Sequence, residues 1–285
     1  MNVYFFNFHG YGDIHMSRAF VNDIINHLHE NYIFYYFSIH RKNILKDIKK
    51  INWINHLSNS SINENTEFCI IDDNIYINTW FCHGNGIYFD THCSLYTLYK
   101  IFSIVYKNLN LELRDLYHYI PKINIFELGD YKTLRFIKKN IHYRKKILVC
   151  ANDVTSNQCP NFDFVPIIEP IADSFKDYLF IITVDYDGDH PNIVSTNQIY
   201  RQDFDLNEIS HLSIYCDVIV GRASGAYTFT ITKENINDKK KIFVCFSEFK
   251  IYSVALRIDE VQCKIFWFNN YNEQFIKKQI IQVIK

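Results

Sequence analysis

The stretch with the most chemical potential is residues 217–232, which read DVIVGRASGAYTFTIT. An apolar run at 218–220 predicts a buried strand, and the segment from Ala226 onward predicts a helix. Amide groups at the start of a helix have no partners inside the helix, and the helix dipole adds partial positive charge there. The small-residue turn at 221–225 is therefore a candidate anion-binding loop.

The residue types in this turn suit a diphosphate. Gly221 and Gly225 let the backbone approach a ligand closely, and the Ser224 hydroxyl can donate a hydrogen bond. The Arg222 guanidinium can hold a phosphate through two hydrogen bonds. An ordinary glycine-containing connection between a strand and a helix has the same pattern, so the turn alone fits both interpretations. The candidate diphosphate-binding residues are Arg222, Ser224, Gly225, Ala226 and Tyr227.

A second glycine turn, HGYGD at 9–13, follows a strand candidate at 3–8 and precedes a helical pattern at 14–31. Open α/β sheets bind their ligands at this kind of turn. Asp13 is a candidate general base that accepts a proton from an acceptor hydroxyl, or the cap of the following helix, or both. The turn matches only half of a dinucleotide fingerprint, because His15 replaces the third glycine. Gly12, in the same turn, is a candidate nucleotide contact.

Two further segments carry polar groups that suit a phosphate or a sugar. Residues 151–158, ANDVTSNQ, follow a strand candidate at 147–150, and their candidate binding residues are Asn152, Thr155 and Ser156. Glu208 lies in the first turn of a helix candidate at 206–214. It is either a solvated carboxylate or a partner for the nucleotide or for Arg222.

An acidic loop at 185–192, DYDGDHPN, contains two Asp-x-Asp triplets. Such pairs hold Mg²⁺ or Mn²⁺ against a diphosphate in one large class of sugar transferases, although Gly188 and Pro191 suit a solvated turn equally well. The position of the glycine excludes an EF-hand. We expect no bound metal and no other cofactor. The residues of an imaginable zinc site, which match no standard spacing, are Cys82, His83, His92 and Cys93.

Composition places the chain among globular proteins with reduced cysteines. Its 285 residues are 48% hydrophobic and include 24 Phe and 21 Tyr, which is enough for two packed domains. Thirty basic against 31 acidic side chains give a net charge of -1, so neither nucleic acid nor an anionic membrane is expected as the main partner. The eight cysteines form no Cys-x-x-Cys pair.

The first residues, MNVYFFNFHGYGDIH, lack the features of a secretory signal, and no apolar run reaches the length of a membrane span. We therefore expect a cytoplasmic protein without a transmembrane segment, which leaves room for peripheral contact with a membrane.

Strand and helix patterns alternate along the chain, most regularly after residue 146. This alternation predicts α/β architecture with parallel sheets. A basic helix at 126–143 is expected to link two domains, residues 1–143 and 144–285. The second domain is expected to contain strands at 147–150, 179–184, 193–195, 218–220, 242–246 and 264–268, with helices at 165–176, 206–214, 226–235 and 273–283.

With these residues in place, the chain resembles the GT-B class of glycosyltransferases, above all its heptosyltransferase-like and fucosyltransferase-like members. The resemblance rests on the Gly-x-Gly-Asp turn at 10–13 and on the unit of acidic helix, strand, Ser-Gly turn and helix at 205–232. The sequence is also similar to uncharacterised bacterial proteins encoded near surface-polysaccharide genes, which share the sequence motif NEISxLS…VGRASG.

The resemblance implies two Rossmann-like domains whose parallel sheets face a central cleft. It also implies a nucleotide-sugar donor bound mainly by the C-terminal domain and an acceptor that approaches from the N-terminal domain. Transfer would be inverting and metal-independent, with Asp13 as the base. Heptosyltransferases usually show Asp-Ser-Gly followed by histidine, whereas this chain has Ala223-Ser224-Gly225 followed by Ala226-Tyr227-Thr228, so the sugar and the donor base stay open.

The leading hypothesis is thus a sugar transferase that acts on a glycan or lipid-linked acceptor. One alternative is a binding module that keeps the nucleotide or glycan site without catalysis. The other is a metal-dependent transferase that uses the Asp-x-Asp loop.

Overall fold

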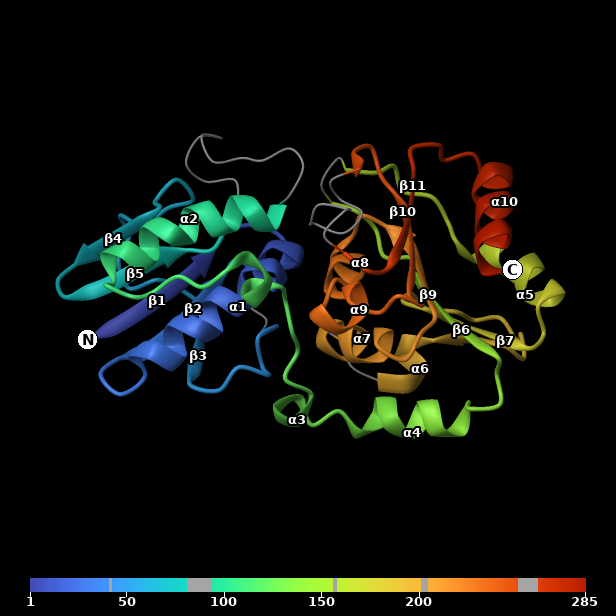
Figure 1. Cartoon of the computed structure of the whole chain (residues 1–285), viewed down its shortest axis with the longest axis horizontal. Coiled ribbons are helices and arrows are strands. Elements are labelled where there is room, and N and C mark those ends of the chain that lie inside the picture. The colour runs from blue at the N-terminus through green and yellow to red at the C-terminus, as the bar shows by residue number, and fades with distance from the viewer. Residues whose placement is uncertain (41–42, 81–93, 156–157, 201–204, 251–260) are drawn as a thin grey trace. The chain divides into compact units, whose positions relative to one another are not determined.

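The computed structural model describes residues 1–40, 43–80, 94–155, 158–200, 205–250 and 261–285 (Figure 1). The chain divides into two compact units, Met1–Leu128 and Gly129–Lys285. This division precedes the expected border at residue 143, because helix α4 (Tyr131–Lys139) packs on two helices of the second unit, α6 (Thr196–Tyr200) and α7 (Leu206–Ser213).

The first unit contains a five-stranded sheet in the order β3-β2-β1-β5-β4. Only β4 runs antiparallel to its neighbour. The β4–β5 hairpin turns at Asp72 and Asp73, whose φ angles of 47° and 60° suit a two-residue hairpin turn. The strands are β1 (Asn2–Asn7), β2 (Ile33–Ser38), β3 (Ile51–Ile54), β4 (Phe68–Ile71) and β5 (Asn74–Asn78).

The helices of the first unit pack through aromatic side chains. Phe20 stacks on Phe102 with a centroid distance of 4.4 Å and on Tyr119 with a centroid distance of 4.1 Å, so it joins three helical segments. Such packed ring pairs stabilise a core beyond the area they bury. The helices are α1 (Tyr11–Leu28), α2 (Ser94–Asn108), the 3₁₀ helix η1 (Leu116–Tyr119) and α3 (Ile125–Leu128).

The second unit contains six parallel strands in the order β8-β7-β6-β9-β10-β11. The chain therefore starts in the middle at β6, builds outward to β8, and returns to the middle at β9. This is the doubly wound Rossmann order, in which β6 and β9 form the topological switch point. The strands are β6 (Lys145–Cys150), β7 (Tyr178–Ile182), β8 (Ile193–Ser195), β9 (Val218–Arg222), β10 (Ile242–Phe246) and β11 (Lys264–Phe268).

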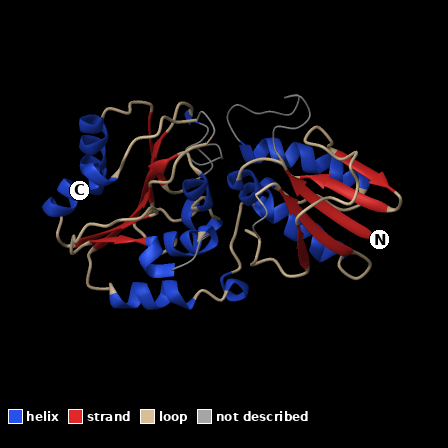
Figure 2. Cartoon of the chain, turned by 180° about the vertical axis from the view of Figure 1, so that it is seen from behind, coloured by secondary structure: helices blue, strands red, loops and turns tan. Residues whose placement is uncertain are grey.

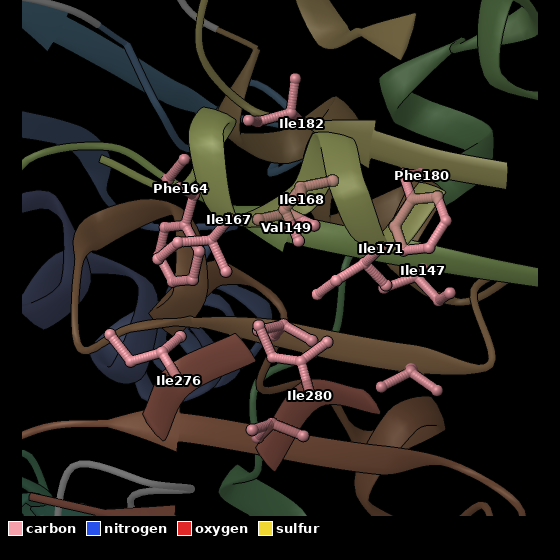
Figure 3. Packing of buried hydrophobic residues seen from close by; sticks show 14 of the residues in the cluster. Ile147, Val149, Phe164, Ile167, Ile168, Ile171, Phe180, Ile182, Ile276 and Ile280 are labelled. Atoms are coloured by element: carbon pink, nitrogen blue, oxygen red, sulfur yellow. The ribbon is translucent and has the colours of Figure 1, made fainter. Parts of the chain in front are cut away.

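A continuous apolar core fixes this second sheet. Figure 3 shows side chains of β6 and β7 packed against those of α5 (Val165–Ser174) and α10 (Glu273–Ile284). Every residue of β7 is buried, as expected for a parallel strand that is covered on both faces. The labelled core residues include Ile147, Val149, Ile168, Ile171, Phe180, Ile276 and Ile280.

The prediction of two Rossmann-like α/β domains with parallel sheets is confirmed (Figure 2). Two expected helices are each divided. The helix expected at 126–143 is interrupted at Gly129, whose φ of 63° is incompatible with a continuing helix. The helix expected at 226–235 becomes α8 (Gly225–Phe229) and α9 (Lys233–Ile236), because Thr232 caps the second helix. Within the described ranges, no helix is long and apolar enough to cross a bilayer.

Candidate functional site

The loops that follow β6 and β9 meet at the carboxyl edge of the second sheet. Cys150, the last residue of β6, lies directly opposite Gly221 of β9 in the parallel register. The turn at 221–225 therefore leaves the sheet beside the loop that begins at Ala151. Ligands of open α/β sheets bind in the crevice at such a switch point. The two loops that the sequence predicts to bind phosphate are adjacent.

Gly221 is required by packing. A Cβ atom at this position would lie 2.7 Å from Cys150 Cβ and 2.9 Å from Tyr227 Cδ2, which is closer than real contacts of this kind. Tyr227 is itself completely buried, and burial raises the pKa of its hydroxyl well above the ordinary value. Gly221 thus allows the start of α8 to lie directly on β6 and β9, and the ring of Tyr227 belongs to the core.

Gly225 has a different environment. Among the described residues, leaving aside its chain neighbours and the backbone of its own helix, no heavy atom lies within 4 Å of the position that its Cβ would occupy. The backbone of the turn is open there with respect to this part of the chain. Ser224, the preceding residue, caps α8 by accepting a hydrogen bond from the Tyr227 amide at 3.4 Å. Ala226, the next residue, is buried. A ligand at this turn would approach the Gly225 backbone.

The Arg222 guanidinium ties the two loops together. It donates a hydrogen bond to the Phe162 carbonyl at 2.7 Å and another to the Ala151 carbonyl. Its central carbon, Cζ, also lies 5.2 Å from the centroid of the Phe162 ring. Its ionic partner is Asp153, at 3.3 Å. Burial lowers the pKa of Arg222, and the charge of Asp153 acts in the opposite direction. The side chain is only 2% exposed, whereas that of Asp153 is 79% exposed.

The loop after β6 is anchored by Thr183, the residue that directly follows β7. Asn152 donates to the Thr183 carbonyl at 3.2 Å, and the Thr183 hydroxyl donates back to the Asn152 side chain at 2.5 Å. The Thr183 hydroxyl also accepts from the Ala151 amide at 2.9 Å. Thr155 is exposed, and Ser156 lies outside the described residues. Asn152 thus has a fixed orientation at the carboxyl edge of β6.

The ionic partner observed for Arg222 is Asp153, and a role of Glu208 toward the nucleotide stays a prediction. Glu208 is not the solvated carboxylate that was the other expectation. It is buried on α7, and its charge acts on Tyr200, whose pKa is raised well above the ordinary value by burial and by nearby carboxylates. The Tyr200 hydroxyl donates to the Glu208 carbonyl at 3.2 Å. The geometry therefore links Glu208 to the packing of α6 on α7.

The acidic loop between β7 and β8 is cross-linked to its surroundings. Asp185 accepts a hydrogen bond from Asn197 of α6, and the Tyr186 hydroxyl donates to Glu169 at 3.1 Å. Among the residues that the structure describes, no three His, Cys, Asp or Glu side chains gather in a way that could hold a metal ion. The imagined zinc residues at 82, 83, 92 and 93 lie outside the described ranges.

Asp13 lies in the first turn of α1, at the carboxyl edge of the first sheet. The N-cap position is taken by Gly10, so Asp13 does not cap the helix. Gly12 occupies the same turn. Burial raises the pKa of the Asp13 carboxyl to about 7, and a hydrogen bond from the Gly10 backbone opposes this shift. A carboxyl group with such a pKa is suited to general base catalysis near neutral pH.

Asp13 interacts electrostatically with a buried polar cluster of the first sheet. Its charge acts on Tyr36 of β2, whose pKa is raised mainly by burial. The Tyr36 hydroxyl bonds to Thr79 Oγ1 at 2.6 Å, and Asn7 of β1 donates to the same oxygen at 3.3 Å. These buried hydrogen bonds link β1, β2 and the residue that follows β5.

Sequence reasoning did not identify several residues that shape the two sites. Asp153 and Thr183 both follow buried strands of the second sheet. Their positions after these strands could have predicted that they lie at the carboxyl edge of the sheet, where ligands bind. His9 stacks on Trp80 with a centroid distance of 3.5 Å. The two residues are far apart in the chain, so no local sequence pattern predicts this contact.

Comparison with solved structures identifies the fold class. A family 9 glycosyltransferase from Veillonella parvula is similar with a TM-score of 0.56 and 11% identity, covering 99% of this chain and 90% of that chain. The E. coli heptosyltransferase WaaC with ADP is similar with a TM-score of 0.55 and 9% identity, covering 99% of each chain. WaaC with ADP-2-deoxy-2-fluoro heptose has a TM-score of 0.53 and 9% identity over 100% of each chain.

No protein-family model matches the sequence, and no curated protein matches it. The fold is that of the GT-B glycosyltransferases, with two Rossmann-like domains, as the sequence resemblance predicts.

Proposed function

We propose that this protein is a glycosyltransferase that moves a sugar from a nucleoside-diphosphate sugar to a hydroxyl group of a glycan or lipid-linked acceptor. The observation that carries the proposal is the switch point of the second sheet, where the open backbone at Gly225 adjoins a loop held by Arg222 and Thr183. The similarity of the whole chain to glycosyltransferases supports this assignment.

The donor diphosphate binds over the turn at 224–226. Backbone amides at the start of α8 face the diphosphate, and Gly225 allows the close approach. A phosphate oxygen that displaces the exposed carboxylate of Asp153 gains the Arg222 charge without moving the guanidinium from its two carbonyl partners. Positive charge supplied in this way stabilises the leaving diphosphate without a metal ion.

Asp13 removes the proton from the acceptor hydroxyl as its oxygen attacks the anomeric carbon. The bond from that carbon to the diphosphate oxygen breaks, and the nucleoside diphosphate leaves with the electron pair. Attack from the side opposite the leaving group inverts the anomeric centre. The pKa of about 7 places Asp13 near the balance between holding and releasing this proton at neutral pH.

Adenosine diphosphate sugars are the first donors to test, because similar structures contain ADP and an ADP-heptose analogue. Calorimetric titration of ADP, GDP, UDP and CMP into the protein measures donor recognition. Turnover is measured as release of nucleoside diphosphate from the recognised donor in the presence of glycan acceptors.

Nucleotide affinity without turnover on any acceptor would contradict the proposed enzymatic activity and favour a binding module. Loss of turnover with EDTA, restored by Mn²⁺, would contradict metal independence.

A further inference from the structure

We infer that helix α4 and the turn after it form a docking surface for an anionic membrane. The surface consists of three apolar side chains, Tyr131, Leu134 and Ile141, and of the cations around them, Lys132, Arg135, Lys138 and Lys139. This inference goes beyond the proposed sugar transfer and does not depend on it.

The outward orientation of α4 is fixed by a buried network on its opposite side. Asp130 caps the helix and accepts hydrogen bonds from the Thr133 amide, at 3.1 Å, and from the Thr133 hydroxyl. Its carboxylate lies 3.0 Å from His211 Nδ1 of α7. The Thr133 hydroxyl also contacts the Tyr200 hydroxyl of α6 at 2.6 Å. The helix therefore has a defined inner face centred on Thr133.

The outer face exposes apolar groups that a folded chain ordinarily buries. Tyr131 is 76% exposed, Leu134 is 45% exposed, and Ile141 is 76% exposed. Positions 131, 134 and 138 follow one another at intervals of three and four residues, so they lie on one side of the helix. Figure 1 shows α4 at the margin of the second unit. This side of the helix presents apolar and basic groups together.

The charge around these apolar groups is strongly one-sided. Residues 131–146, YKTLRFIKKNIHYRKK, contain five lysines, two arginines and no acidic residue, although the whole chain carries a charge of -1. Arg135, Lys138 and Lys139 are exposed. Lys132 donates to the Tyr200 carbonyl, and among the described residues no carboxylate pairs with it. Arg144 is different, because it pairs with Asp177 at 2.8 Å, and it is left out of the surface.

Charge complementarity selects the occupant. Exposed helices that bring together lysine or arginine with aromatic or leucine side chains bind at the interface of anionic bilayers, where the apolar groups enter and the cations contact lipid phosphates. A protein partner of the same shape would need an acidic surface with apolar pockets for Tyr131 and Ile141. The anionic bilayer supplies both kinds of contact without such pockets.

The test measures sedimentation of the full-length protein with two kinds of vesicle, phosphatidylcholine alone and phosphatidylcholine mixed with phosphatidylglycerol. The wild-type protein is expected to sediment with the mixed vesicles only, and added salt is expected to weaken this binding. The variant Lys138→Glu/Lys139→Glu is expected to bind at least about tenfold more weakly. The variant Tyr131→Ser/Leu134→Ser is expected to bind more weakly, and its residual binding is expected to keep the salt dependence.

Lys239→Glu/Lys240→Glu is the matched control, because it changes the same charge at two exposed lysines in the turn before β10. It is expected to bind as the wild-type protein does, and equal loss in both lysine pairs would overturn the inference. Failure of the wild-type protein to bind mixed vesicles would also overturn it. So would a wild-type dimer, measured by analytical ultracentrifugation, that Tyr131→Ser/Leu134→Ser converts to a monomer. Circular dichroism of each variant verifies the fold.

Discussion

Asp13 combines a near-neutral pKa with a position at the carboxyl edge of the first sheet. If it is the base, Asp13→Asn removes turnover and leaves donor affinity unchanged, because the amide cannot accept the proton. The rate for the wild-type enzyme is expected to rise through about pH 7 as the carboxyl group ionises. Steady-state rates across this range, together with calorimetric donor affinity, test the assignment. Full turnover by the Asn variant would disprove it.

The same shift affects stability. The folded pKa of Asp13 lies above that of the unfolded chain, so folding favours the protonated form. Its contribution is fully present below about pH 4 and is lost as the pH rises to about 7. Asp13→Asn is therefore expected to be more stable than the wild-type protein above pH 7, by about 2–4 kcal/mol, and the difference should vanish in acid. Urea unfolding at both ends of this range provides the measurement, and a pH-independent difference would contradict the pKa.

Gly221 and Gly225 have distinct roles, and one substitution separates them. Gly221→Ala is expected to lower the free energy of unfolding by about 1–3 kcal/mol, because its methyl group meets Cys150 and Tyr227. Gly225→Ala has open space and should keep wild-type stability within about 0.5 kcal/mol. Urea unfolding of both variants tests this contrast. Equal stability losses would contradict the packing.

The sequence identified the turn at 221–225 because small residues and an apolar strand leave a local pattern. It could not assign Tyr227 to the core, since that depends on how α8 packs on the sheet, where its ring contacts Phe243 of β10. The bonds of Arg222 to Ala151 and Phe162 were hidden for the same reason. Chemistry that arises from neighbouring residues is readable in a sequence, whereas contacts between distant strands require the fold.

At the scale of elements, α4 depends on a buried carboxylate. Burial opposes the ionisation of Asp130, but hydrogen bonds from His211 and Thr133 outweigh it, so its pKa lies below the ordinary value. Asp130→Ala is expected to cost about 2–4 kcal/mol, because it removes a helix cap and leaves His211 without this partner. Asn272→Ala removes only the cap of α10 and should cost about 1 kcal/mol. Thermal unfolding compares the two, and equal costs would contradict the importance of the buried network.

The observed bounds of helices and strands show which of them a local sequence pattern can predict. Strands β8, β10 and β11 agree with the expected ranges, because short apolar runs between polar residues mark the strands of a parallel sheet. Strand β3 was not expected, since its residues are only partly buried and lack a strong apolar pattern. The break between α3 and α4 depends on the backbone conformation of Gly129, which residue periodicity does not encode.

At the scale of the whole molecule, the structure adds the order of the strands and the distribution of charge, neither of which composition gives. The parallel order of the second sheet follows from the alternation of strands and helices, and it confirms the expected fold. A net charge of -1 gave no reason to expect a membrane as the main partner, yet the basic residues of 131–146 are gathered on one segment. Net charge averages over such local asymmetry. The basic run is visible in the sequence, but the structure is needed to show that it lies beside exposed apolar side chains on one face of α4.

The central claim is that a nucleoside diphosphate binds the open turn at the switch point of β6 and β9. Calorimetric titration of ADP, GDP and UDP into the full-length protein and into Gly225→Ala tests it most directly. We predict saturable binding of at least one diphosphate to the wild-type protein, weakened at least about tenfold, or about 1.4 kcal/mol, in the stable alanine variant. Absence of binding to the wild-type protein, or equal affinity in both proteins, would contradict the claim.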